Sequence, residues 1–342
     1  MARGVAVFTV VLTLAATAGS TASATARVGS AFVLVGGTTG SAVGQSVQAV
    51  EDDGTIPDGT NGLQASMVRV LTTSGVTVRI VLSSFKSTSD ARRYFSSYAQ
   101  SGQPVAGLSG QSSVDGNGRV TVQKGAQLLQ IEARPSADLE NQLDQIKLNG
   151  GDPRTSPAYA ALTETGPSIA RSLASRMRGS AVSKPSLQLP KGAVNPCVLG
   201  AKAAKKALGS NTPVTSGYSL SEEPPGMQCV YTGSGGPIGL IVTTNPQLQS
   251  AITTSDVETL YDANLTSSRG QGATELTGVG TKAFSTPSSE RVEAVVGQGK
   301  KATLVVAVGE ISLSYRREVL QDFIKAWIAA FSKASPPGGV AR

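Results

Sequence analysis

The residues that could do chemistry in this chain are limited by its histidine and cysteine content. The 342 residues include no histidine and two cysteines, Cys197 and Cys229. Without histidine, Ser-His-Asp and Cys-His nucleophilic systems and histidine-based zinc sites are excluded, together with the commonest general base near neutral pH. A bridge between the two cysteines would also exclude thiolate catalysis and thiolate metal binding. Carboxylate pairs, Ser-Lys dyads and metals with oxygen ligands remain.

Three short motifs could supply such chemistry, and each has a plainer interpretation. Ser83 to Lys86 fits the S-x-x-K pattern of penicillin-recognising enzymes, but the partner motifs S-D-N and K-T-G are absent. The acidic run Glu51 to Gly54, with Asp58 to Asn61, could offer oxygens to calcium, but acidic glycine-rich runs are usually solvated loops. Gly278 to Gly280 lacks the third glycine of a nucleotide loop and predicts a turn with positive φ. We therefore predict no catalytic residue, no metal site and no cofactor.

The first 26 residues predict a secretory signal peptide. Arg3 supplies the positive end, Val5 to Gly19 is an uncharged, mostly apolar run, and small residues from Ala22 to Ala26 offer two cleavage sites. The run is shorter than the ~20 residues of a membrane-spanning helix, so no stable transmembrane span is expected. An uncleaved anchor is the alternative. No cysteine lies near the run to carry a lipid, so we predict a secreted or extracytoplasmic protein, retained by the cell wall or free.

The charge of the chain is weakly basic and spread along the sequence. The formal net charge is +7, and aromatic residues make up 4%. A nucleic-acid-binding protein would concentrate lysine and arginine on one face and interleave aromatic residues, so nucleic acid is excluded as a partner. A mildly basic surface suits an anionic cell wall or membrane, or is ordinary solubilising charge.

The two cysteines predict a structural disulfide. In an exported chain, an even number of cysteines with none left over favours the pair Cys197 and Cys229. The closed loop would stabilise its domain by roughly 3 kcal/mol in the chain-entropy model. A redox pair is the alternative, but the C-x-x-C spacing typical of one is missing.

The sequence contains an internal repeat, which indicates two copies of one domain. The segments that correspond are Phe32 to Val35 with Cys197 to Gly200, Gly44 with Gly209, Ser89-Asp90 with Ser255-Asp256, Gly107 with Gly278, and Lys124-Gly125 with Gln298-Gly299. Their separation grows slowly, as expected when surface loops lengthen between two copies of one fold. We predict a signal peptide at 1–26, a first α+β domain at 27–180, a linker at 181–194, and a second α+β domain with the disulfide at 195–335.

The residue pattern of each copy predicts an α+β domain, in which an antiparallel sheet is flanked by helices. In the second copy, we expect helices at 201–208, 255–265 and 315–331, with Trp327 in the core. Strands are expected at 228–231, 238–242, 291–296 and 302–308, and 210–225 reads as polar and turn-rich. In the first copy, we expect hairpins at 64–82 and 119–133, a helix at 89–99 with Tyr94, Phe95 and Tyr98 inward, a short helix at 137–148, and a closing helix at 168–177.

The second copy resembles a known family. Its pattern consists of Asn195 to Leu199, a small Ala/Lys helix ending at Gly209, Cys229 at a strand start, Gly278 to Phe284, a glycine-centred hairpin and an amphipathic last helix. This pattern is similar to secreted proteins and lipoproteins of unknown function common in actinobacteria. The resemblance covers about residues 195–332 and implies a PsbP-like α/β/α sandwich. In the first copy, Phe32 and a position near Ser66 replace the cysteines.

These observations predict a non-catalytic binding or scaffold protein of an actinobacterial cell envelope. The resemblance implies a fold and a place but brings no activity with it. The expected partner is an envelope protein, a cell-wall polymer or a lipid. Two alternatives stay open: an extracytoplasmic small-ligand or lipid carrier, which needs an apolar cavity, and a carboxylate-dependent envelope hydrolase, which needs two acidic side chains facing one cleft.

Overall fold

The structure is a computed structural model of the whole chain. It describes residues 30–57, 64–99, 102–108, 110–115, 118–184, 186–189, 194–222, 225–243, 256–287, 290–298, 301–309 and 317–334. The predicted signal peptide, the whole Asp58 to Asn61 segment, and residues 185 and 190–193 of the predicted linker lie outside these ranges.

The first sheet is antiparallel and has six strands. Its strands are β1 (Val47–Ile56), β2 (Gln64–Thr72), β3 (Val76–Ser84), β4 (Gln111–Val114), β5 (Val120–Lys124) and β6 (Gln127–Pro135). In space they follow the order β1-β2-β3-β6-β5-β4. The helices of this part are α1 (Ser30–Val35), α2 (Thr88–Tyr98), α3 (Ala137–Leu148) and α4 (Pro157–Ala174). We call this sheet with these helices the first lobe.

The second sheet repeats that order with one short strand added. Its strands are β7 (Thr215–Glu222), β8 (Pro225–Gly233), β9 (Gly236–Thr243), β10 (Thr274–Glu275), β11 (Lys282–Thr286), β12 (Arg291–Val296) and β13 (Thr303–Gly309). Read from β7, they run β7-β8-β9-β13-β12-β11-β10. With α5 (Ala201–Ala207), α6 (Val257–Ser268) and α7 (Arg317–Ala334) they form the second lobe. The chain therefore has the predicted α+β class, with two antiparallel sheets in tandem.

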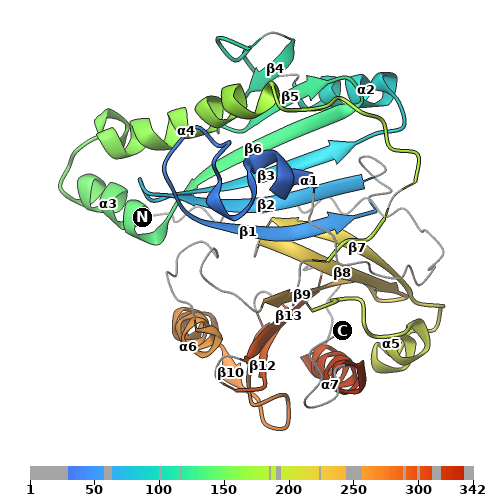
Figure 1. The fold of residues 1–342 in the computed structure, drawn as a ribbon. Coiled ribbons are helices and arrows are strands. Elements are labelled where there is room, and N and C mark those ends of the chain that lie inside the picture. Colours follow the sequence, from blue (N-terminus) through green and yellow to red (C-terminus); the bar gives the residue numbers. More distant parts are fainter. Residues whose placement is uncertain are drawn as a thin grey trace.

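Helices cover the sheets in layers (Figure 1). In the second lobe, α5 and α7 pack on one face and α6 on the other, because successive residues of β13 point to opposite faces and both sets are apolar. In the first lobe, α1 and α4 cover one face, where Val78, Ile80 and Ile131 are fully buried. On the opposite face α2 covers the end near Phe85 and Leu128. The rest of that face is of mixed polarity.

The closing helix of the second lobe has its predicted core. Leu320, Phe323, Ile324 and Trp327 recur at three- and four-residue spacing in α7 and are almost fully buried. Phe323 meets Tyr231 edge to face, with ring centroids 5.1 Å apart. Trp327 is therefore a core residue, as predicted.

The sequence predictions for the 210–225 stretch, for the closing helix of the first lobe and for Tyr98 are wrong. The polar stretch expected at 210–225 contains β7, which pairs with β8 along its whole length. The closing helix of the first lobe does not start at Ser168: α4 begins at Pro157 with Ser156 as its N-cap and passes through Pro167. Tyr98 does not point inward, since 42% of it is exposed. The helix predicted at 137–148 is confirmed as α3.

The two lobes meet through an apolar contact, which we call the lobe-contact cluster. Its buried members are Ile56, Ala65, Met67 and Val81 of the first sheet, Leu187 of the linker and Met227 of β8. The linker also joins the edge of β1, because Thr55 and Gln188 exchange two backbone hydrogen bonds of 2.8 Å. Figure 1 shows β7 and β8 lying directly against the β1 edge of the first sheet. The lobes are thus docked.

Among the helices in these ranges, none is both long and apolar enough to cross a membrane.

We expect Met227→Asp to separate the lobes without unfolding them. Met227 is 9% exposed in the lobe-contact cluster, and a carboxylate placed there without a partner costs about 3 kcal/mol. The radius of gyration from small-angle X-ray scattering should rise, and proteolysis near Gln188 should become faster. Leu148→Asp, at a position that is 77% exposed, is the control and should change neither. An unchanged radius of gyration in Met227→Asp would contradict this role of the cluster.

Candidate functional site

The weak motifs lie in structural elements. Ser83 and Ser84 end β3 and are 4% and 5% exposed, so the S-x-x-K segment closes a packed strand. Gly278 and Gly280 adopt φ of +73° and +60°, as predicted for a turn. A Cβ on Gly280 would lie 2.3 Å from the Val295 carbonyl oxygen, so a side chain is sterically excluded there.

The acidic run Glu51 to Gly54 is not the solvated loop expected from the sequence. It lies in β1, where Glu51 is directly opposite Arg69 of β2 and the register shifts between Asp52 and Gly54. Glu51 and Asp53 are two residues apart in a strand, so their side chains point to the same face. Both are acceptors for Arg69: its Nη2 lies 2.9 Å from Glu51 and 2.7 Å from Asp53, and its Nε donates to Asp53 at 2.8 Å. These carboxylates therefore hold an arginine inside the protein.

Arg69 belongs to a row of charges that crosses the mixed face of the first sheet. Glu51 of β1 lies directly opposite Arg69 of β2. Arg69 in turn lies opposite Arg79 of β3, and Arg79 lies opposite Glu132 of β6. Arg119, just before β5, reaches Glu132 from the far side. We call these five residues, together with Asp53 of β1 and Arg134 of β6, which pair with Arg69 and Glu132, the charged row. Arg79 also donates from Nε to the sulfur of Met67, at 3.1 Å, so the row borders the lobe-contact cluster.

One end of the charged row is rich in arginine. Arg134 donates to Glu132 Oε1 from Nη2 at 2.8 Å and from Nε at 3.0 Å. Arg79 and Arg119 each lie 3.5 Å from Oε2 of the same carboxylate. Burial alone would raise the pKa of Glu132, but the three guanidiniums outweigh it and lower that pKa.

The other end is rich in acid, and its central arginine is deeply buried. Burial raises the pKa of Glu51 from 4.5 to about 7, since the opposing charge of Arg69 is shared with Asp53 and the neighbouring carboxylates add repulsion. The side chains of Arg69 and Asp53 are only 5% and 7% exposed, while that of Glu51 is 20% exposed. A substrate therefore has little access to Asp53, the second carboxylate of the pair.

Among the described residues of the second lobe, Glu293 is a comparable buried acid. Glu293 of β12 is 1% exposed, and burial raises its pKa. It pairs with Arg291 and accepts a 3.1 Å hydrogen bond from the amide of Asn264. These contacts join α6 to the sheet, so the role of Glu293 is structural.

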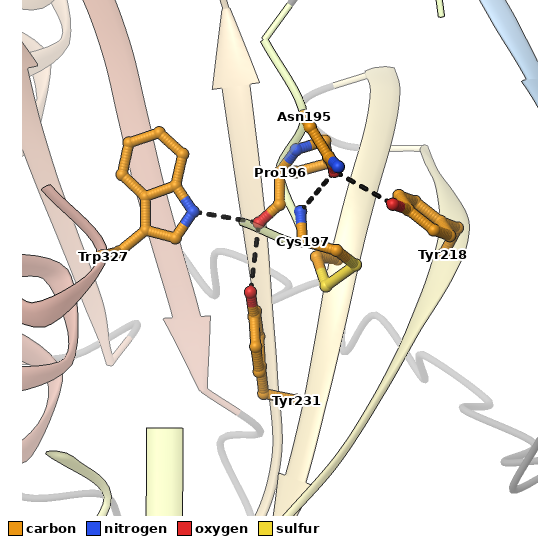
Figure 2. The surroundings of a disulfide bond; sticks show 7 residues. Asn195, Pro196, Cys197, Tyr218, Tyr231 and Trp327 are labelled. Atoms are coloured by element: carbon orange, nitrogen blue, oxygen red, sulfur yellow. Dashed lines mark hydrogen bonds between the residues drawn. A yellow bond between two sulfur atoms is a disulfide. The ribbon is translucent and has the colours of Figure 1, made fainter. Parts of the chain in front are cut away.

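The predicted disulfide is present and organises the entry of the chain into the second lobe. Cys197 and Cys229 are bonded, with Cα atoms 5.1 Å apart. Figure 2 shows Pro196 between Trp327 and Tyr231: its carbonyl oxygen accepts from Trp327 Nε1 at 2.9 Å and from the Tyr231 hydroxyl at 3.3 Å. The bond thus holds in place the acceptor that two buried aromatic side chains require.

The neighbouring asparagine completes this arrangement. Asn195 Oδ1 accepts from the Cys197 N–H at 2.8 Å and from the Tyr218 hydroxyl at 3.0 Å (Figure 2). Tyr218 also packs against the lobe-contact cluster. The disulfide region and the contact between the lobes are therefore linked through one side chain.

The first lobe replaces the disulfide by a hydrogen bond. Ser66, on the face of β2 covered by α1, accepts from the Ala31 N–H at 3.0 Å. Ser66 is 1% exposed, and the bond ties the first helix of the lobe to its second strand, as Cys229 does on β8. The position proposed from the sequence near Ser66 is thus the one that makes this contact.

Two of the surface hollows in the described ranges illustrate what the surface offers. One of about 270 Å³ is lined by Asp144, Lys147 and Leu148, and one of about 580 Å³ by Gly200, Ala201, Lys202, Ala203 and Lys206. Both are open to solvent, and neither contains two acidic residues. Within the same ranges, no three acidic or cysteine side chains form a group that could hold a metal ion.

Sequence reasoning missed the charged row. A usable signal is present, because Arg69 and Arg79 are the single charges of their largely apolar strands and Glu132 shares its strand with Arg134. A charge in a buried strand needs a partner. Their juxtaposition depends on the register between β3 and β6, which are separated in the chain by α2 and two further strands.

We expect loss of the disulfide to lower the free energy of unfolding of the second lobe by about 3 kcal/mol, because the bond closes a loop of 32 residues. The variant is Cys197→Ala with Cys229→Ala, measured by urea unfolding followed by circular dichroism. Reduced wild type should match it, and reductant should not affect the variant. A loss well below ~1 kcal/mol would mean that hydrogen bonds alone position Pro196.

We expect the stability of the first lobe to fall as pH rises from about 5 to about 7. The raised pKa of Glu51, about 7, means that the folded state binds this proton more tightly than the unfolded state. Its stabilising contribution is present below the ordinary value of 4.5 and is lost as pH passes 7. The absence of histidine leaves this window clear of the usual titrating group.

Urea midpoints at several pH values test this, with Glu51→Gln as the variant and Glu140→Gln, an exposed residue of α3, as the control. Glu51→Gln should flatten the slope, while Glu140→Gln should retain it. A wild-type stability that rises across this window would show that the sign is wrong.

Comparison with protein-family models, with curated proteins and with solved structures finds no match for this chain. The resemblance to PsbP-like envelope proteins therefore stays a prediction.

Proposed function

We propose that this protein is a non-catalytic, exported binding or scaffold protein of the cell envelope. The observation that carries the proposal is the charged row: its carboxylates are paired with arginines on the strands of a packed sheet. Charged groups fixed in this way are suited to binding a partner of opposite charge. A general acid or base, in contrast, must lie within reach of a proton on the substrate. The predicted signal peptide and the disulfide support an oxidising location outside the cytoplasm.

The hydrolase alternative would have to use Glu51 and Asp53. A carboxyl whose pKa lies near 7 has the proton affinity that a general acid needs at neutral pH. Arg69, however, lies between the two acids and engages both. The carrier alternative would need an enclosed apolar cavity, whereas both described hollows are open to solvent. No specific observation favours either alternative over a binding role.

We expect the purified mature protein to be retained saturably by one of three materials: cell-wall polymer, vesicles of anionic phospholipid, or an immobilised extract of envelope proteins. Retention is measured by co-sedimentation or elution, with the heat-denatured chain as the control for adhesion. No soluble product should be released from the wall material. Lack of retention by all three materials would contradict the proposal. Products whose release is abolished in Glu51→Gln would support the hydrolase alternative instead.

A further inference from the structure

Acidic residues are absent from one long stretch of the chain. Residues 165–221 contain eight lysines and arginines and no aspartate or glutamate. The formal net charge of the whole chain is +7, so this stretch carries all of the excess positive charge and the remainder is close to neutral. Basic residues are therefore spread along the sequence, but the acids that offset them are not.

The basic residues of this stretch are exposed and have no acidic partner. Seven of the eight are described, and all seven are exposed. They are Arg171, Arg176, Arg178, Lys184, Lys202, Lys205 and Lys206. Within the described part of the chain none of these seven is in an ion pair, whereas Arg69 and Arg134 are paired with carboxylates. We call the seven residues the basic strip.

Backbone contacts place the first half of the basic strip across one end of the first sheet. After α4, the Gly179 carbonyl accepts from the Ala126 N–H at 2.8 Å, in the turn between β5 and β6. The Val182 N–H then donates to the Phe85 carbonyl at 2.9 Å, just after β3. The chain next pairs with Thr55, near the end of β1. The segment that carries Arg176 to Lys184 is thus fixed along this end of the sheet.

The second half of the basic strip lies on the other lobe. Three of its lysines are on α5, which Figure 1 shows at the lower right, below the segment that descends from α4 on the same side. The hollow of about 580 Å³ beside α5 is lined by Lys202 and Lys206 together with glycine and alanine. This hollow offers room for one unit of a bound chain. The basic strip therefore extends over both lobes.

The composition of the stretch selects the class of partner. Its one aromatic residue is Tyr218, and the Tyr218 hydroxyl donates to Asn195, so the bases of a single-stranded nucleic acid find no row of rings to stack on. The large hydrophobic residues that are exposed in the described ranges lie outside this stretch, so a membrane finds no side chain here to insert. A row of exposed cations attracts instead a flexible chain of repeated negative charges.

We propose that the basic strip binds a linear polyanion, a polymer whose repeating units carry phosphate or carboxylate groups, along both lobes. This inference rests on the proposed function, because it names the polymer as the partner among the three envelope materials. Each lysine or arginine that contacts the polymer releases a counterion from it, so the affinity falls steeply as the salt concentration rises.

The test is isothermal titration calorimetry of the full mature chain with poly(glycerol phosphate) and, in parallel, with polygalacturonate, at several salt concentrations. Wild type should bind one or both polymers saturably. It should bind the polymer at least about a hundredfold more tightly than the matching monomer, glycerol phosphate or galacturonate, because several weak contacts act together.

Two triple variants remove one half of the basic strip each: Lys202→Gln with Lys205→Gln and Lys206→Gln, and Arg176→Gln with Arg178→Gln and Lys184→Gln. Each should weaken binding about tenfold or more and lower the salt dependence by about one unit of slope for each lost contact. The control removes three exposed cations elsewhere, by Lys147→Gln with Arg154→Gln and Arg269→Gln, and should retain the affinity. Circular dichroism confirms that each variant folds.

The strip is contradicted if neither polymer binds saturably, if the control loses as much affinity as the two strip variants, or if one strip variant binds like wild type. Tighter binding of vesicles of anionic phospholipid or of a single-stranded oligonucleotide would overturn the choice of partner. Polymer binding without retention by any envelope material would contradict the proposed function alone. Retention by an envelope material that both strip variants keep, with no binding of either polymer, would contradict this inference alone.

Discussion

In each lobe, one antiparallel pairing joins the strands before the middle helix to the strands that follow it. β3 pairs with β6 from Val76–Pro135 to Ser84–Gln127, and β9 pairs with β13 in the same way. Such non-local pairing has a high cost in loop closure, which the burial of apolar residues on the sheet faces offsets. It also sets Arg79 opposite Glu132 and so assembles the charged row. The candidate site therefore depends on the same contact as the fold.

The sequence predicts most of the local structure and little of the site. Hairpins such as β2–β3, where apolar residues flank a Thr-Ser-Gly turn, follow from alternation and turn chemistry. The helices α3, α5 and α7 follow from spacing and caps. The edge strands β1 and β7 are not predictable from local pattern, because polar and charged residues interrupt their alternation and pairing with the neighbouring strand decides their structure. The acidic run of β1 therefore reads as a loop in the sequence. Only the register, which no local pattern encodes, brings Glu51 to Arg69.

The two lobes share a strand order but stabilise it by different means. The second sheet carries an apolar cluster on each face and has a disulfide where its chain enters. The first sheet replaces that bond by the hydrogen bond of Ser66 and keeps one face mixed. The charged row and the lobe-contact cluster both lie on this mixed face. If one fold was duplicated, as the shared order indicates, the two copies have come to differ in the polarity of one sheet face.

Trp327 has a consequence for observing this protein in solution. It is the one tryptophan of the chain, and its indole N–H is bonded to the Pro196 carbonyl in the interior of the second lobe. Its intrinsic fluorescence therefore reports on that lobe, while tyrosines such as Tyr94 and Tyr98 represent the first lobe. Excitation at a wavelength selective for indole follows one half of the molecule, and comparison with a whole-chain signal shows whether the halves unfold together or in sequence.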